Sequence, residues 1–321
     1  MHFGVISTAT IGRKRVIPAI QQTDGATVAA IASRDQTHAE EVAAEFNIPT
    51  AYGSYAELLE DDRIDAIYNP LPNSLHAEWT KRSADAGLDV LCEKPLGVNA
   101  QEAKEMTAYC EDRGVTLMEA FMYRYHPRTQ RARDIAANHL GEIRRVDAQF
   151  HFTLPDEYNV RLDPDLAGGS LMDVGCYTVT AARLFLGEPK SVYATAVDNR
   201  GCGVETNLTG HLSFSGGKTA TISSGFDESV HQYTVLGTEG RLEVDRAFVP
   251  DGETTLCYTV DGRTVEERFD PVDQYKLEVE AFLDAVESGE SPRTDGNEAV
   301  RTMRVVDALY ESVDCEAPVT L

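Results

Sequence analysis

Two short motifs in the sequence carry side chains that could move a proton. Lys94 lies in a Glu-Lys-Pro motif directly after a short apolar segment. Asp173 and Tyr177 follow a Gly-Gly pair and lie four residues apart, a spacing that puts both side chains on one face of a helix. A lysine, an aspartate and a tyrosine that converge form a proton-transfer set suited to an alcohol or a carbonyl.

The first third of the chain predicts the sheet that positions Lys94. Short apolar or β-branched segments alternate there with helical stretches, which is typical of a parallel, doubly wound α/β sheet. The predicted strands cover residues 3–7, 26–33, 65–69, 89–92 and 115–121, and the predicted helices include 11–22 and 36–46. We therefore expect a Rossmann dinucleotide-binding domain over residues 1–121.

The pattern changes from Glu142 onward. Segments 146–152, 208–214, 219–224 and 232–236 alternate apolar and polar residues, which indicates antiparallel strands with one solvated face. The helix that carries Tyr177 interrupts them, and two late helices are expected near 275–288 and 298–312. The sequence predicts an α+β domain over residues 122–321 with an open, mostly antiparallel sheet, whose last helices pack back on the first domain.

The N-terminal strand runs into a turn that could hold a pyrophosphate. The dinucleotide signature Gly-x-Gly-x-x-Gly appears here as Ser-x-Ala-x-x-Gly, and small residues at all three positions permit close approach. The following helix N-terminus offers unpaired amides and a positive dipole end. An ordinary turn between a strand and a helix is the alternative interpretation. The expected cofactor contacts are Ser7, Thr8, Ala9, Ile11 and Gly12.

The end of the second predicted strand bears on the choice of cofactor. An acidic residue there would select a free ribose 2′-hydroxyl, whereas Ser33 and Arg34 offer a hydroxyl and a fixed cation to a 2′-phosphate. His38, four residues after Arg34, is a further candidate contact. The alternative is a solvated pair of Arg34 and Asp35 that opens a helix. We predict NADP in preference to NAD.

Two more motifs follow predicted strands, at the edge where open α/β sheets bind ligands. Pro72, Asn73 and His76 follow one strand, and Glu93 and Lys94 end the next. Glu93 is expected to contact the nicotinamide ribose or to hold Lys94. Asn73 and His76 are expected to line the cofactor loop, although His76 is equally consistent with a helix N-terminal residue that binds no ligand.

The Glu-Lys-Pro motif and the Gly-Gly-x-Leu-x-Asp-x-Gly motif at 168–175 together carry a resemblance over essentially the whole chain. The sequence resembles the glucose-fructose oxidoreductase and inositol dehydrogenase family (Gfo/Idh/MocA), which pairs a Rossmann domain with an open-faced α/β domain. Segments 7–9, 120–127, 159–162 and 175–177 resemble its branch of NADP-dependent D-xylose dehydrogenases and dimeric dihydrodiol dehydrogenases. The chain departs from the family in its degenerate glycine-rich turn and in Tyr177, where many relatives carry histidine.

The resemblance implies a role for each member of the proton-transfer set. Lys94 would hydrogen-bond the reacting oxygen and stabilise developing negative charge. Tyr177 would be the general acid or base, and it needs the ammonium nearby because a phenol has an ordinary pKa of about 10. Asp173 would orient a sugar hydroxyl or Lys94. The alternatives are a solvated lysine, an aspartate favoured by a helix dipole and a core tyrosine. Further candidates to contact the substrate are Arg124, His126, Tyr158, Asn159 and Arg161.

The implied reaction is oxidation of the C1 hydroxyl of an aldose, D-xylose, to a lactone with NADP. Three alternatives remain open: an NADPH-dependent reductase of a keto or anhydro sugar, a trans-dihydrodiol dehydrogenase, and a non-catalytic NADP-binding sensor. The sequence leaves open which sugar is preferred, the direction of the reaction and whether the bond before Pro95 is cis. We expect no metal site, because histidines and carboxylates lack clustered spacing.

The charge of the chain bears on its surroundings. The 53 acidic residues outnumber the 29 basic ones, for a net charge of −24, and they are spread along the sequence. This distribution predicts a solvated, halophilic surface and disfavours nucleic-acid binding. Six scattered cysteines and the lack of an apolar run of eighteen residues predict a cytoplasmic protein that binds no membrane. An open sheet predicts a homodimer or homotetramer through the C-terminal domain.

Overall fold

The computed structural model describes residues 1–155 and 158–321, which form two compact units. The first unit consists of Met1–Tyr125 and Asp273–Val300, and the second of His126–Val272 and Arg301–Leu321. The helix α9 (Gly296–Cys315) contributes residues to both units. The division at residue 121 that the sequence predicts stays a prediction; the first unit also includes a late segment of the chain.

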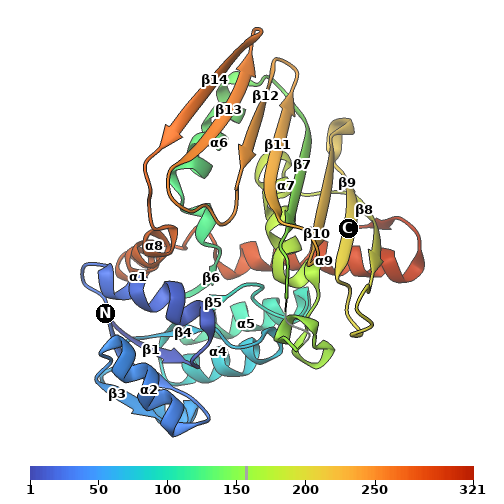
Figure 1. Cartoon of the computed structure of the whole chain (residues 1–321). Coiled ribbons are helices and arrows are strands. Elements are labelled where there is room, and N and C mark those ends of the chain that lie inside the picture. Colours follow the sequence, from blue (N-terminus) through green and yellow to red (C-terminus); the bar gives the residue numbers. More distant parts are fainter. Residues whose placement is uncertain (156–157) are drawn as a thin grey trace. The chain divides into compact units, whose positions relative to one another are not determined.

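The first unit is built on a parallel sheet of six strands among the described residues, in the order β3-β2-β1-β4-β5-β6 (Figure 1). The strand order runs outward in both directions from β1 and β4, as in a doubly wound fold. The predicted strands are confirmed, and the short β3 adds an edge that was not predicted. The strands are β1 (His2–Ile6), β2 (Thr27–Ala32), β3 (Thr50–Tyr52), β4 (Ala66–Asn69), β5 (Asp89–Glu93) and β6 (Leu117–Ala120).

Helices of the first unit follow its strands and cover the sheet. The helices are α1 (Ile17–Gln22), α2 (Gln36–Phe46), α3 (Tyr55–Leu59), α4 (His76–Asp85), α5 (Ala100–Arg113) and α8 (Gln274–Ser288). α1 packs against α8, and α4 against α5. The rings of Phe3 in β1 and Phe282 in α8 lie 5.8 Å apart, and both side chains are fully buried. The late helix is therefore part of the core of this unit.

The second unit contains a sheet of nine strands among the described residues, in the order β14-β13-β12-β11-β7-β10-β9-β8-β15. The pairs are antiparallel except β7 with β10, which run parallel. The sequence predicted these two strands as antiparallel, and this is corrected: the chain crosses over through a helix and two strands between them, which leaves them in the same direction. The strands are β7 (Ile143–His151), β8 (Ser191–Val197), β9 (Asn207–Ser213), β10 (Thr219–Gly225), β11 (Val230–Gly237), β12 (Gly240–Asp245), β13 (Thr254–Val260), β14 (Arg263–Phe269) and β15 (Val319–Thr320).

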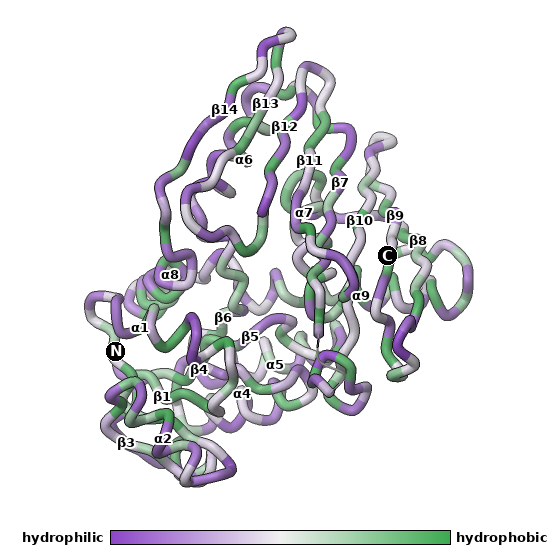
Figure 2. Tube along the Cα trace, viewed as in Figure 1, coloured by the Kyte–Doolittle hydropathy of each residue, from purple (hydrophilic) through white to green (hydrophobic). Residues whose placement is uncertain are grey.

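One face of the second sheet is covered by helices. α6 (Pro127–His139) lies along β12 and β13, and α7 (Cys176–Leu186) packs on β7, β10 and β11 (Figure 1). The predicted open, mostly antiparallel sheet is confirmed. The edge strand β14 is mainly hydrophilic (Figure 2) and exposes charged side chains, which disfavours pairing with another chain's strand.

Candidate active site

The turn after β1 bends sharply at Ser7. This residue has a φ of 84°, in the left-handed region that favours glycine. Its amide donates to Ala32 O at 2.9 Å, and its hydroxyl oxygen accepts from Ala9 N at 3.1 Å. Serine thus replaces the first glycine of the dinucleotide signature with a side chain that closes the turn. A Cβ on Gly12, where the helix starts, would lie 3.4 Å from the ring of Tyr68, which is van der Waals contact.

At the end of β2, Arg34 is exposed, whereas the neighbouring Asp35 caps the next helix. The pKa of Tyr55 is raised by burial and lowered in part by the charge of Arg34. Asp35 is the N-cap of α2, where its carboxylate accepts from His38 N at 3.3 Å. The side chain of His38 is exposed, with Nδ1 3.5 Å from Glu41 Oε2. Asp35 stabilises the helix, and Arg34 is the charged group that remains exposed at the strand end.

His76 joins the two loops that follow β4 and β5. Its ring is fully buried, with Nδ1 2.9 Å from Pro95 O and Nε2 2.8 Å from Leu71 O. Burial lowers the pKa of His76, against hydrogen bonds to these carbonyls that raise it. This geometry corrects the expectation of a cofactor contact. His76 holds the loops that carry Pro72, Asn73 and Lys94, because both ring nitrogens face backbone oxygens.

The Glu-Lys-Pro motif rests on buried polar groups. The Tyr68 hydroxyl donates to Glu93 Oε1 at 2.7 Å, and Leu96 N donates to Glu119 Oε1 at 2.8 Å. The peptide bond between Lys94 and Pro95 is cis. Burial, and next the charge of Glu93, raises the pKa of Tyr68 well above its usual value. The backbone on both sides of Lys94 is therefore fixed by side chains from neighbouring strands.

In the second unit, two glycines bring a loop onto the start of a helix. A Cβ on Gly168 would lie 2.5 Å from the carbonyl oxygen of Arg161. Gly169, with a φ of 113°, donates its amide to the same oxygen at 2.8 Å. A π-helical turn (Leu171–Gly175) follows and continues into α7. The Gly-Gly pair therefore allows the loop at 159–162 to lie against this helix.

That loop brings Arg161 to Asp173. Arg161 Nε lies 2.6 Å from Asp173 Oδ2, and Asn159 Oδ1 accepts from Arg161 N at 3.1 Å. The guanidinium carbon also lies 5.8 Å from the centre of the Phe152 ring. The Arg161 side chain is 40% exposed and the Asp173 side chain 13%, so the pair is open to a ligand on the arginine side. Among the predicted substrate residues, Asn159 and Arg161 are the ones brought to Asp173.

Tyr177 lies one turn after Asp173 and is only 4% exposed. Its ring lies 5.3 Å from that of Phe150 and 5.6 Å from that of Phe248, centre to centre. Aromatic contacts on two sides restrict the ring, and the helix fixes its distance along the axis from Asp173. The proposed acid-base group is thus held by packing within its own unit.

Three predicted substrate residues are placed differently from expectation. Arg124 is buried in the first unit, with Nη1 3.3 Å from Glu298 Oε1. His126 accepts from Arg128 N at 3.0 Å as the N-cap of α6, and burial lowers its pKa to about 4. Tyr158 is 95% exposed. Arg124 and His126 are thus buried beside protein partners, and their contact with a substrate stays a prediction.

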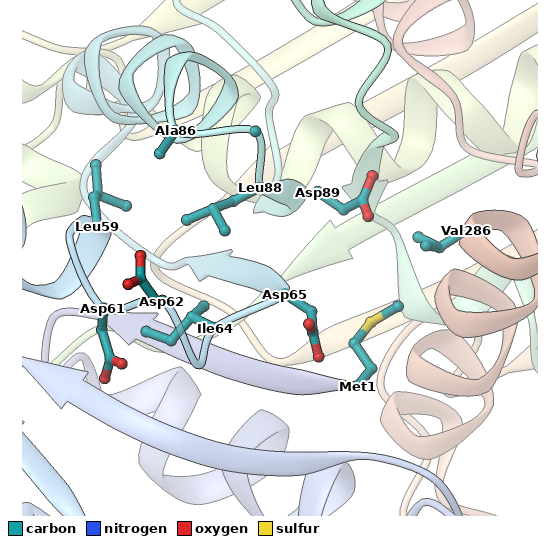
Figure 3. A pocket seen from close by; sticks show the side chains of 11 residues that line it. Met1, Leu59, Asp61, Asp62, Ile64, Asp65, Ala86, Leu88, Asp89 and Val286 are labelled. Atoms are coloured by element: carbon teal, nitrogen blue, oxygen red, sulfur yellow. The ribbon is translucent and has the colours of Figure 1, made fainter.

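A hollow in the first unit is lined by four aspartates (Figure 3). Its volume is about 580 Å³, and it lies where β1, β4 and β5 begin, at the sheet edge opposite to Ser7, Arg34 and Lys94. Two of its carboxylates accept backbone hydrogen bonds: Asp65 accepts from His2 N and Asp89 from Thr116 N. The residues described offer no cluster of three metal-binding side chains. Within the same residues, no helix is both long and apolar enough to cross a bilayer.

The order of the parallel sheet, the tight turn after β1 and the cation after β2 define a dinucleotide-binding oxidoreductase fold. Residues 1–121 match the family described as "Oxidoreductase family, NAD-binding Rossmann fold", and residues 129–243 match the "GFO/IDH/MocA C-terminal domain". The chain belongs to the GFO/IDH/MocA oxidoreductase family, as its motifs predicted.

Relatives with named activities cover most or all of the chain. D-xylose 1-dehydrogenase (NADP(+)) 2 of Haloferax volcanii is 55% identical over 325 residues, with 100% of both chains covered. Trans-1,2-dihydrobenzene-1,2-diol dehydrogenase of Mus musculus is 33% identical, covering 78% of this chain and 76% of the relative. The solved structure of a 3-ketoreductase from Actinomadura kijaniata with NADP and TDP-benzene has a TM-score of 0.92 at 33% identity, covering 97% of each chain.

Sequence reasoning missed several buried groups that support the site. Glu119, Tyr68 and Glu278 lie around the Glu-Lys-Pro motif, and Glu205 and Tyr310 lie at the start of the helix that carries Asp173. The only signal for Glu119 is a charged residue within an apolar strand. Glu205 and Tyr310 carry no local signal, because they are distant in sequence from the helix they contact.

Proposed function

We propose that this protein is an NADP-dependent dehydrogenase that oxidises the C1 hydroxyl of an aldose, D-xylose, to the lactone. The observation that carries the proposal is the 55% identity to the Haloferax enzyme over the whole chain, with Lys94, Asp173 and Tyr177 present. Arg161 paired to Asp173 gives the second unit a polar cluster suited to sugar hydroxyls.

The residues present fit NADP. The positive φ at Ser7 and the small residues that follow leave a turn that a pyrophosphate can approach, and Thr8 and Ala9 are partly exposed there. Arg34 would pair with the 2′-phosphate, and Ser33 would offer a hydroxyl beside it. Asp35 is occupied as a helix cap and so does not compete for Arg34 at that position. When bound, NADP accepts the hydride from the sugar.

Residues of this chain would then accept one proton and stabilise one developing negative charge. Tyr177 takes the proton of the C1 hydroxyl, and Lys94 stabilises the oxygen as negative charge develops on it. Asp173 orients a sugar hydroxyl, and Arg161 holds the Asp173 carboxylate in one direction through a charge-assisted hydrogen bond. This division of roles runs equally well in the reductive direction.

Substitution of Tyr177 and Lys94 tests these roles. Tyr177→Phe keeps the ring that packs on Phe150 but removes the acid-base group, and Lys94→Ala removes the cation. We expect each to lower turnover with D-xylose and NADP by roughly 10² or more, with NADP still bound. The double variant should be little worse than either single one, because the groups act as a unit. Near-normal turnover of folded, NADP-binding Tyr177→Phe would remove Tyr177 from the mechanism.

Assays with different substrates distinguish two other activities and a non-catalytic role from the proposed activity. The named relatives include a 3-ketoreductase and a dihydrodiol dehydrogenase, so the same residues could reduce a keto sugar or oxidise a trans-dihydrodiol. An initial-rate panel of aldoses, keto and anhydro sugars and trans-dihydrodiols with both cofactors would rank these activities. NADP binding without turnover of any substrate would favour a sensor.

We also propose the setting in which the enzyme works. The net charge of −24 and the Haloferax relative support a salt-adapted cytoplasmic protein. Val197 and Tyr193 of β8 are exposed on the uncovered sheet face of the second unit, at 54% and 41%. A homodimer or homotetramer through this face would bury them. Sedimentation at molar salt would measure the assembly, and a monomer would contradict it.

A further inference from the structure

Glu205 lies in the loop between β8 and β9, and its carboxylate contacts the start of the helix that carries Asp173 and Tyr177. Glu205 Oε1 accepts from Leu171 N at 2.7 Å, and the Glu205 backbone oxygen accepts from Ser170 N at 2.9 Å. The first amides of a helix have no partner within it. One residue, distant in sequence, therefore satisfies two consecutive amides at this helix start.

Tyr310 of α9 completes the contact from the other side. Its hydroxyl lies 3.2 Å from Glu205 Oε1 and 3.3 Å from Glu205 Oε2. Burial, and next the charge of Glu205, raises the pKa of Tyr310 well above its usual value, so its hydroxyl stays protonated and donates to the carboxylate. The amides of Ser170 and Leu171 thus end on Glu205, whose carboxylate is held by Tyr310.

The surrounding residues leave little room for this group to move. A Cβ on Gly169 would lie 2.5 Å from Glu205 Oε2, so glycine is needed for the carboxylate to approach. The Ser170 hydroxyl lies 3.0 Å from the Ser224 hydroxyl of β10, which ties the same turn to the sheet. Burial raises the pKa of Glu205, and hydrogen bonds from Leu171 and Tyr310 oppose that rise.

We propose that Glu205, held by Tyr310, is a positioning residue that fixes the depth and rotation of the helix segment bearing Asp173 and Tyr177. The inference rests on the proposed function, in which these two side chains act on the substrate. Asp173 lies two residues after Leu171 and Tyr177 six, so any shift of the helix start is carried to both. A misplacement of 1 Å at a reacting group can cost about 10² in rate.

Three variants test the proposal against a matched control. Glu205→Ala removes the acceptor, Glu205→Gln keeps an oxygen for Leu171 N, and Tyr310→Phe removes only the hydroxyl. Glu188→Ala is the control, because Glu188 pairs with Arg183 at 2.6 Å at the far end of the same helix. Each is assayed at molar salt with D-xylose and NADP for kcat, both KM values and the pH profile of kcat.

We expect Glu205→Ala to lower kcat by about tenfold and to displace the pH profile, with KM for NADP changed by less than about twofold, since the cofactor residues lie in the other unit. Glu205→Gln should recover most of kcat, Tyr310→Phe should fall between them, and Glu188→Ala should match the wild type. Amide hydrogen exchange at residues 170–173 should accelerate in Glu205→Ala and stay unchanged in Glu188→Ala.

Unchanged kcat and pH profile in folded Glu205→Ala would overturn the proposal. If that variant does not fold, wild-type kcat, pH profile and amide hydrogen exchange in Tyr310→Phe would overturn it. The proposed function fails separately: it falls if the wild-type protein shows no NADP-dependent turnover of D-xylose, and amide hydrogen exchange in the Glu205 variants still tests the contact at the helix start in that case.

Discussion

At the scale of single residues, charged side chains that look equivalent in the sequence have different environments in the structure. Arg34 is exposed at the end of β2, while Asp35 next to it caps α2. Arg161 is paired to Asp173, while Arg124 is buried on Glu298. Residue type alone does not distinguish a partly exposed guanidinium from one that is buried against a carboxylate; the structure does.

Cofactor preference is tested at Arg34. Arg34→Ala should raise KM for NADP by at least about tenfold, or roughly 1.4 kcal/mol, and change KM for NAD little, because charge-assisted hydrogen bonds to the 2′-phosphate are lost. Arg241→Ala, an exposed strand arginine of the second unit, is the control and should change neither. Equal effects of Arg34→Ala on the two cofactors would rule out the assigned contact.

A buried carboxyl in α8 predicts pH-dependent stability. Burial, and next the charges of Glu93, Asp273 and Glu119, raise the pKa of Glu278 well above its usual value. Its stabilising contribution is therefore greatest below the ordinary glutamate pKa of about 4.3 and is lost as pH rises toward the folded-state value. Glu278→Gln removes the ionisation, so its Tm relative to wild type should increase between pH 4 and pH 8.

The exposed Glu280 on the same helix supplies the control for this measurement. Glu280→Gln should give a Tm difference from wild type that changes little over the same pH range. A Glu278→Gln difference that is constant with pH would show that Glu278 ionises in the folded protein as it does in the unfolded chain.

At the scale of elements, the loop at 159–169 and the helix after it form one structural piece. The Gly168 site allows the Arg161 carbonyl to approach, and the same loop aims the Arg161 side chain at Asp173. The helix then sets Tyr177 one turn beyond. Backbone contacts thus explain the glycine at position 168. The helix repeat explains why Asp173 and Tyr177 are four residues apart.

Gly168→Ala should disturb that piece. A Cβ 2.5 Å from a backbone oxygen forces the loop away, which we expect to cost about 1–3 kcal/mol and to lower kcat together with Tm. Gly187→Ala, at the other end of α7, is the comparison, because a Cβ there meets no atom within 4 Å and only its positive φ opposes alanine. Calorimetry in which Gly168→Ala is no less stable than Gly187→Ala would contradict the steric argument.

At the scale of the whole molecule, the net charge of −24 is the feature from which we predict a salt dependence of stability. Ion pairs between exposed side chains, such as Arg82 with Glu78 and Arg241 with Glu243, neutralise one acid for each base and so leave the excess of acidic residues unpaired. The remaining negative charges repel one another, and salt screens that repulsion. Stability should therefore depend on ionic strength in a way that no single residue explains.

Thermal unfolding in KCl tests this expectation. Tm should fall as ionic strength drops from molar to tens of millimolar, because the Debye length grows from about 3 Å to beyond 10 Å. Sucrose at matched osmolality should not replace KCl, since it does not screen charge. Midpoints that stay flat across the salt range would rule out salt adaptation through charge screening.

The sequence by itself determined the two kinds of sheet, the turn after β1, the Glu-Lys-Pro motif and the helix face that carries Asp173 and Tyr177. These depend on periodicity and on short spacings, which local backbone geometry converts directly into structure. The two groups of candidate residues, each encoded within about ten residues, could be proposed for that reason. The same reasoning could not assign His126 or Arg124, because their types are equally suited to a ligand and to a buried pair.

Only the tertiary structure decided which polar groups support the site. Glu205 is 34 residues from the amide of Leu171 to which it bonds, and Tyr310 is 105 residues from Glu205. His76 was ambiguous until its ring was found between the carbonyls of Leu71 and Pro95. The contacts of Glu205, and that of His76 with Pro95, join segments that meet only after the sheets form, and no local pattern records such a meeting.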